Sequence, residues 1–124
     1  MLTLLDTNAA LRYLLEDIQE QADVVADAVL NGAEITIEVL AECVYVLEGV
    51  YHVSRSDIAE SLGCLLDEVT CRRKQVAATA LGYYSGSTFD FVDCILAAER
   101  DLEERVVLTF DKKLSKLLTS IDSV

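Results

Sequence analysis

The chain has 124 residues, a size that fits one domain with one contiguous core and excludes a two-domain arrangement. Hydrophobic residues make up 52% of the chain and charged residues 26%, which supplies enough apolar surface for folding and excludes intrinsic disorder. The formal net charge of −12 argues against a broad basic face for nucleic acid. Residues 1–54 contain ten acidic residues and one basic residue, so any positive surface that contacts phosphate must come largely from the later residues.

The cysteines and the hydropathy pattern indicate where the protein works. The four cysteines form no CxxC pair and the chain has one histidine, a combination that disfavours zinc and suits reduced, structural thiols. No apolar run has the length needed to span a bilayer, and the first residues lack the pattern of a secretory leader. We therefore expect a cytoplasmic protein that does not associate with a membrane.

In the first half, short apolar runs alternate with amphipathic segments. Residues 2–5 are predicted to form a strand, and residues 9–15 take up helical spacing after a polar turn. A second helix is predicted over 19–31, with apolar residues recurring at i, i+3, i+4 and i+7. A second strand over 34–37 then leads into a helix over 38–47 that is apolar on most of its faces, which is typical of a central helix.

The second half continues the alternation of helices with short apolar runs. The predicted elements in chain order are a helix over 58–68 capped by Ser54 or Ser56, a brief edge strand over 69–71, helices over 74–84 and 90–102, a third main strand over 106–109, and a last helix opened by Asp111. Continuous apolar strands that alternate with helices indicate a parallel sheet covered on both faces, so the predicted fold class is α/β. In such sheets the ligand crevice lies beyond the carboxyl ends of the strands.

Several acidic residues fall where this fold would place a ligand. Asp6 and Asp111 follow apolar runs predicted to be strands, and parallel strands would bring both to one edge of the sheet. Asp90 and Asp93 lie three residues apart at a predicted helix start, so both can face the same side. Glu42 lies in the mostly apolar helix after the second strand.

Each of these acids also has a plain structural interpretation. The aspartates are good helix caps or first-turn residues, and Glu42 could belong to a solvent-exposed stripe. Several carboxylates in one crevice would nevertheless repel each other by about 4 kcal/mol per close pair at an effective dielectric near 20. A hard divalent cation would offset that repulsion, and oxygen ligands suit Mg²⁺ or Mn²⁺. A carboxylate-held Mg²⁺ site is suited to phosphodiester hydrolysis.

Four short motifs, in this order and spacing, resemble those of the PIN-domain ribonucleases, most closely the VapC-type toxins of toxin–antitoxin modules. They are Leu4–Asn8, Glu38–Glu42, Asp90–Ala98 and Leu108–Leu114. The resemblance spans the chain and implies a single PIN-like domain over residues 1–124, with a short central parallel sheet flanked by helices on both faces. It also implies a Mg²⁺-dependent endoribonuclease that acts on RNA, forms homodimers and is covered by a cognate antitoxin protein.

The same resemblance assigns roles to individual residues. Asp6, Glu42, Asp93 and Asp111 would form the catalytic quartet that binds Mg²⁺ or Mn²⁺, with Asn8, Asp90 and Thr109 as auxiliary polar residues. No family motif matches the segment between Glu42 and Asp93, which leaves the choice of RNA open.

Basic residues in the second half are candidates for holding RNA. Arg72, Arg73 and Lys74 form the one dense basic cluster, which either starts a solvated helix or contacts phosphates if it faces the crevice. Lys112 follows Asp111 directly and has the same two interpretations.

Two other functional classes remain open. A receiver-like phosphoacceptor signalling domain has a similar length, acidity and Mg²⁺ pocket, but it requires an aspartate at the end of a middle strand. A catalytically inactive binding module would use the acidic first half to engage a partner protein. The middle of the chain is predicted to be too helical to supply that aspartate, and the presence of all four acids gives no support to an inactive module.

Overall fold

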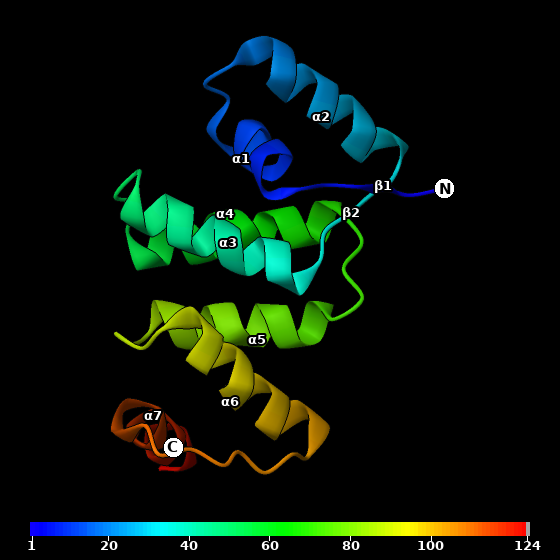
Figure 1. Ribbon diagram of the computed structural model, residues 1–124. Coiled ribbons are helices and arrows are strands. Elements are labelled where there is room, and N and C mark those ends of the chain that lie inside the picture. Colours follow the sequence, from blue (N-terminus) through cyan, green and yellow to red (C-terminus); the bar gives the residue numbers. More distant parts are fainter. Residues whose placement is uncertain (124) are drawn as a thin grey trace.

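The computed structural model describes residues 1–123, and helices make up most of its regular structure (Figure 1). The elements in chain order are β1 (Thr3–Leu4), α1 (Thr7–Leu15), α2 (Gln19–Asn31), β2 (Ala33–Glu34), α3 (Ile37–Gly49), α4 (Arg55–Glu68), α5 (Lys74–Ser85), α6 (Phe91–Glu103) and α7 (Lys112–Asp122). The two strands pair in parallel, with Thr3 opposite Ala33, and an isolated bridge joins Glu34 to Thr70.

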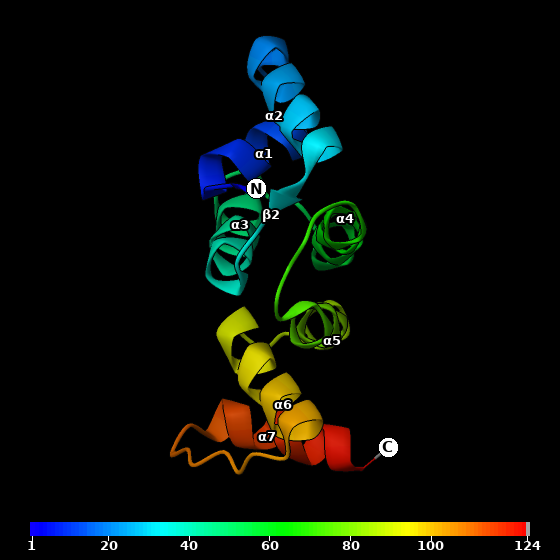
Figure 2. The ribbon, with the colours of Figure 1, turned by 90° about the vertical axis from the view of Figure 1, so that its right-hand side faces the viewer.

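The helices are stacked in chain order along the molecule. Figures 1 and 2 show α1 and α2 at one end, the short strands beside them, α3 and α4 in the next layer, then α5 and α6, and α7 at the far end. The most extensive contacts join α5 to α6, α1 to α2 and α4 to α5. The β1–β2 pair and the α6–α7 end therefore lie far apart in the molecule.

Buried apolar side chains from every helix form one cluster. Tyr84 and Phe91 are its largest fully buried members, and their rings meet edge to face with centroids 5.7 Å apart. This geometry is favourable for aromatic pairs and joins α5 to the first turn of α6. The contact fixes the start of α6, where two of the candidate acids lie.

Local signals explain where several helices begin and end. The side chains of Asp6, Thr36, Ser54 and Asp111 each accept a hydrogen bond from a backbone amide in the first turn of the following helix. Such caps satisfy amides that have no partner within the helix. At the end of α2, Gly32 has a φ of 105°, a conformation that other residues rarely adopt.

The predicted helices are confirmed, with most boundaries shifted by a few residues. Within α2, Ala22 and Val25 are buried as the spacing predicts. The strand expected over 34–37 is shorter and lies at Ala33–Glu34, while α3 already begins at Ile37 because Thr36 caps it. Of the edge strand expected over 69–71, only the bridge at Thr70 forms.

The predicted α/β fold class is wrong. Within residues 1–123 the only sheet has two strands of two residues each, so no central parallel sheet is flanked by helices on both faces. The run over 106–109, expected to be the third main strand, has no strand partner, and Val106 and Leu108 are 95% and 86% exposed. A strand gains its hydrogen bonds from a neighbouring strand, and here β1 is paired only with β2.

The cysteines and the helix hydropathy complete the description. All four cysteines are free, and Cys43, Cys71 and Cys94 are buried. Burial is the main cause that raises the pKa of Cys43 to about 12 and of Cys94 to about 11, so both thiols stay protonated at neutral pH. Among the residues that the structure describes, no helix is both long enough and apolar enough to cross a bilayer.

Candidate functional site

Two of the candidate acids meet where α1 packs against α3. Asp6 follows β1 directly, and its Oδ1 accepts a hydrogen bond of 2.8 Å from the Ala9 amide. The hydroxyl of Thr7 donates to Glu42 Oε2 over 3.0 Å, which holds that carboxylate in place. Burial raises the pKa of the Cys43 thiol, and the negative charges of Glu42 and Asp6 raise it further, because both acids lie near this thiol. Asp6 and Glu42 therefore form one acidic pair.

Three further acids gather where α6 and α7 begin. Asp93 is half-buried, and burial followed by the negative charges of Asp90 and Asp111 raises the pKa of its carboxyl group. The cation of Lys113 opposes this shift only in part. Asp111 caps α7 by accepting from the Lys113 amide over 2.8 Å, and the Asp111 amide donates to Thr109 Oγ1 over 2.9 Å. This second group thus carries like-charge repulsion that Lys113 relieves only in part.

Tyr45 connects the two groups. It lies on α3 one turn after Glu42, and its hydroxyl donates to Asp90 Oδ2 over 3.3 Å. Burial raises the pKa of Tyr45, and the charges of Asp90 and Asp93 raise it further. We use the name acidic face for the surface formed by these carboxylates, which are Asp6, Glu42, Asp90, Asp93 and Asp111. Its members come from four segments that are distant in the sequence, and they form two separate groups with Tyr45 between them.

The carboxylates of the acidic face suit a hard cation in chemical type. Every candidate ligand is an oxygen. Asp93 receives no hydrogen bond within residues 1–123, so the charge of Lys113 alone offsets part of its repulsion from Asp90 and Asp111. Over the same residues, no three acidic, histidine or cysteine side chains converge closely enough to hold a metal ion. The donors fit Mg²⁺ or Mn²⁺ in kind, and binding would require the two groups to approach each other.

The structure also tests the plain interpretation that these acids are helix caps. Asp6 and Asp111 do cap α1 and α7. Asp90 precedes α6 in the cap position, but its side chain accepts no hydrogen bond from the helix amides. Capping therefore accounts for two of the aspartates and leaves Asp90 and Asp93 available for another role.

A cleft between α1 and α2 adjoins Asp6. Its volume is about 450 Å³, and its polar lining includes Asp6, Asn8, Arg12, Glu20 and Gln21. Arg12 Nε is buried and has no hydrogen-bond partner, although the rest of its guanidinium pairs with Asp17 and Tyr51. Sequence reasoning assigned no role to Arg12. The available signal was that it is the one basic residue among the first 54.

The basic cluster before α5, formed by Arg72, Arg73 and Lys74, makes ion pairs with acidic residues of the same chain. Arg72 pairs with Glu34 over 3.1 Å, and Lys74 approaches Asp67 to 3.5 Å. Arg73 contacts Glu99 over 2.8 Å and Glu103 over 3.4 Å.

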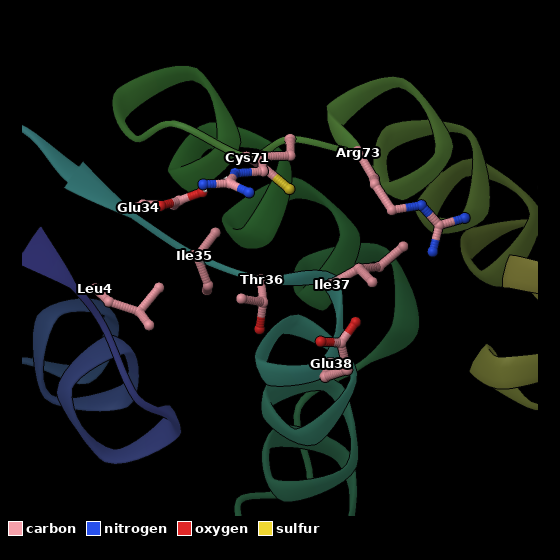
Figure 3. A pocket seen from close by; sticks show the side chains of 9 residues that line it. Leu4, Glu34, Ile35, Thr36, Ile37, Glu38, Cys71 and Arg73 are labelled. Atoms are coloured by element: carbon pink, nitrogen blue, oxygen red, sulfur yellow. Dashed lines mark hydrogen bonds and ion pairs between the residues drawn. The ribbon is translucent and has the colours of Figure 1, made fainter. Parts of the chain in front are cut away.

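Arg72 and Arg73 also line a cavity of about 350 Å³ beside β2, together with Leu4, Ile35 and Glu38 (Figure 3). The cavity is distinct from the cleft that adjoins Asp6. Lys112, in contrast, forms no ion pair with any residue in 1–123 and is exposed next to Asp111. Among the four basic residues predicted to contact phosphate, Lys112 alone has no ion pair within residues 1–123, and it lies beside the acidic face.

Replacement of Asp93 by Asn should stabilise the protein when divalent cations are removed. The pKa of the Asp93 carboxyl is higher in the folded protein than in the unfolded chain, where it is near 4. Ionisation of this group therefore lowers the free energy of unfolding as pH rises from the unfolded pKa through the folded pKa. Asp93 is partly exposed and solvent screens its charge, so we expect a gain of a few tenths of a kcal/mol at pH 7, or about 1–2 °C in Tm.

Thermal unfolding in EDTA at pH 7 and at about pH 4 measures this effect, with the gain shrinking at the lower pH. Glu60→Gln removes one exposed charge from α4 and serves as the control. A loss of stability in Asp93→Asn at pH 7 would contradict the repulsion.

Comparisons with known proteins give no further assignment: no family model, no curated protein and no solved structure matched this chain.

Proposed function

We propose that this protein is a Mg²⁺- or Mn²⁺-dependent endoribonuclease that hydrolyses RNA phosphodiester bonds at the acidic face. The observation that carries the proposal is Asp93, a half-buried carboxylate with a raised pKa beside two other aspartates. Burial and the neighbouring carboxylates disfavour the charged form of Asp93, a bound cation would offset both effects, and perturbed carboxyl groups are frequent at active sites. The motif resemblance to the PIN-domain ribonucleases supports the same reaction.

In this proposal four carboxylates hold the cation, namely Asp6, Glu42, Asp93 and Asp111. The bound cation would supply activation of a water molecule and stabilisation of the departing oxygen. The protein itself orients the ligands. Ala9 fixes one oxygen of Asp6, Thr7 holds one oxygen of Glu42, and the Lys113 amide holds one oxygen of Asp111. Each leaves its second carboxylate oxygen available to the cation.

The polar groups around the acidic face would position the RNA. The cleft next to Asp6 presents the side chains of Asn8 and Arg12, whose polar groups are suited to contacts with RNA phosphates or base edges. Lys112 supplies a free cation beside Asp111. Water would attack phosphorus in line with the 3′-oxygen, so that the new P–O bond forms as the bond to that oxygen breaks. The attacking water would lose its proton to solvent, and the leaving oxygen would take one from solvent.

The biological setting that we propose follows from the same reasoning. Reduced cysteines and an RNA substrate suit the cytoplasm. The resemblance to VapC-type toxins suggests the toxin of a type II toxin–antitoxin pair, with a cognate antitoxin protein as partner. A receiver-like phosphoacceptor is not favoured, because residues 1–123 contain no middle strand that ends in an aspartate.

Titration calorimetry of Mg²⁺ and Mn²⁺ tests the proposal directly. We expect the wild-type protein to bind either cation and to cleave RNA in a reaction that EDTA stops. The Asp6→Asn/Asp93→Asn double variant should lose both binding and cleavage while it remains folded. Cation binding of equal strength in the double variant, or RNA cleavage that persists in EDTA, would contradict the proposal. A folded wild type that binds neither cation, with or without RNA, would favour the inactive binding module.

A further inference from the structure

The cleft between α1 and α2 is lined by both apolar and polar side chains. Its volume is about 450 Å³, and the two helices lie together at one end of the molecule (Figures 1 and 2). Ala9 of α1 and Val24 and Val25 of α2 supply the apolar part of the lining. Binding sites for small organic groups combine such apolar walls with a few polar groups, and a single nucleobase is held with its faces against apolar side chains.

Three polar side chains of the cleft keep their hydrogen-bonding groups free. Asn8, Glu20 and Gln21 all line it and are exposed, and none of them makes a side-chain hydrogen bond or an ion pair within residues 1–123. The amides of Asn8 and Gln21 can each donate and accept, whereas the ionised carboxylate of Glu20 can only accept. The cleft therefore offers both kinds of group to a ligand.

The charges around the cleft favour a neutral ligand over a phosphate. Arg12 is the lining residue with a positive charge, and its Nη1 lies 2.9 and 2.8 Å from the two carboxylate oxygens of Asp17. Its Nη2 donates to the Tyr51 hydroxyl over 3.3 Å. Asp6 and Glu20 add two negative charges to the lining. These carboxylates would repel a phosphate at short range, and they would not repel an uncharged base.

The free polar groups also distinguish one kind of base from another. A carboxylate accepts a hydrogen bond from an exocyclic amino group such as N4 of cytosine, and an Asn or Gln amide pairs with the N6 amino group and N7 of adenine. Uracil has a carbonyl oxygen where cytosine has this amino group, and that oxygen cannot donate to Glu20. The lining is therefore complementary to adenine and cytosine and not to uracil.

The cleft is connected to the acidic face through Asp6. This residue lines the cleft, and it also forms the acidic pair with Glu42. One oxygen of Asp6 accepts from the Ala9 amide, and Ala9 belongs to the wall of the same cleft. A nucleotide whose base lies in the cleft consequently has its backbone next to the acidic pair.

We propose that the cleft between α1 and α2 binds one unpaired nucleobase that carries an exocyclic amino group, adenine or cytosine, and so selects the nucleotide next to the cleaved bond. A base within a duplex is stacked and paired, so it must leave the helix before its edge can reach Glu20 and Gln21. The role in cleavage rests on the proposed nuclease function, whereas binding of the base requires neither the cation nor the reaction.

Nucleosides test the cleft separately from the acidic face, because they carry no phosphate and are added in EDTA. The measurement follows backbone amide resonances by NMR during titration with adenosine, inosine, cytidine or uridine. Inosine has an oxygen in place of the amino group of adenosine, and uridine differs from cytidine in the same way. We expect adenosine and cytidine to bind about tenfold more tightly than their partners. The resonances that shift should be those of residues 6–12 and 20–25.

Variants of two exposed residues show which side chain makes the selection. Glu20→Gln replaces an acceptor by an amide that can also donate, so inosine and uridine should gain affinity and the preference should fall to about twofold or less. Gln21→Leu should weaken binding of adenosine most, because adenine loses a partner for its N6 and N7. Gln75→Leu changes an exposed glutamine of α5 outside the cleft and should bind like wild type. Circular dichroism checks that each variant folds.

Cleavage of a single-stranded RNA of mixed sequence tests the role in the reaction. Wild type should cut next to adenosine or cytidine, and Glu20→Gln should lose this preference while its total rate stays close to that of wild type. The inference fails if nucleosides shift no resonance of the cleft, if all four bind equally to wild type, or if RNA is cut without regard to the neighbouring base. Selective binding of adenosine and cytidine without any cleavage would support the base site and contradict the nuclease function alone.

Discussion

Glu42→Gln should lower Mg²⁺-dependent RNA cleavage by at least about 100-fold, because loss of one cation ligand removes several kcal/mol of transition-state stabilisation. Glu42 lies near Asp6 on the acidic face and is held by the Thr7 hydroxyl over 3.0 Å. Thr7→Val should have a smaller effect of about 10-fold, since it leaves the carboxylate present but no longer oriented. Initial rates on a labelled RNA at saturating Mg²⁺ measure both effects.

The matched control for this series is Glu38→Gln. Glu38 lies one turn earlier on the same helix and is also exposed, but it lines the cavity beside β2 and not the acidic face. We expect its cleavage rate to stay close to that of wild type. Equal losses in Glu38→Gln and Glu42→Gln would show that cleavage depends on general surface charge, and the assignment of Glu42 as a ligand would fail.

The largest expected effect on stability is at Arg55. Its Nη1 donates to the carbonyl oxygens of Tyr84 and Phe89 over 3.2 and 2.7 Å, and its guanidinium lies 4.1 Å from the centroid of the Tyr84 ring. Arg55→Met keeps much of the side-chain volume but leaves both carbonyls without this donor. We expect a loss of about 2–4 kcal/mol in the free energy of unfolding, or roughly 10 °C in Tm.

Arg55 also holds the backbone that leads to the acidic face. The two carbonyls that it binds lie at either end of the connection from α5 to α6, which leads directly to Asp90. Arg55→Lys retains the charge without the planar fork and should recover only part of the lost stability. Chemical denaturation of the three proteins provides the measurement. An unchanged midpoint in Arg55→Met would show that the connection is held by the Tyr84–Phe91 packing alone.

The helices could be predicted from sequence because their signals are local. Ser54 and Asp111 are cap residues followed by apolar positions at helical spacing, and the structure confirms both caps. The strand over 106–109 could not be predicted in the same way. A short apolar run is compatible with several structures, and whether it becomes a strand depends on a partner distant in the sequence. Here no strand among residues 1–123 pairs with it.

In the candidate site, too, the local features could be predicted from the sequence and the contacts between distant segments could not. Asp90 and Asp93 were expected on one side of a helix start, and their spacing of three residues was sufficient for that. The hydrogen bond from Tyr45 to Asp90, which joins two distant helices, depends on how α3 packs beside α6. The ion pairs of the basic cluster are likewise non-local, since Arg73 contacts Glu99 on a helix that begins eighteen positions after Arg73.

The stacking of helices in chain order has a consequence for how the protein acquires its structure. Most of the packing joins helices that are neighbours along the chain, as in α1 with α2 and α5 with α6. Contacts between nearby segments close short loops and therefore form early and rapidly, in microseconds to milliseconds for small helical proteins. A chain emerging from the ribosome can complete one helical layer before the next is synthesised. The Asp6–Glu42 pair would then assemble well before Asp93 and Asp111 are made, so the acidic face is completed last.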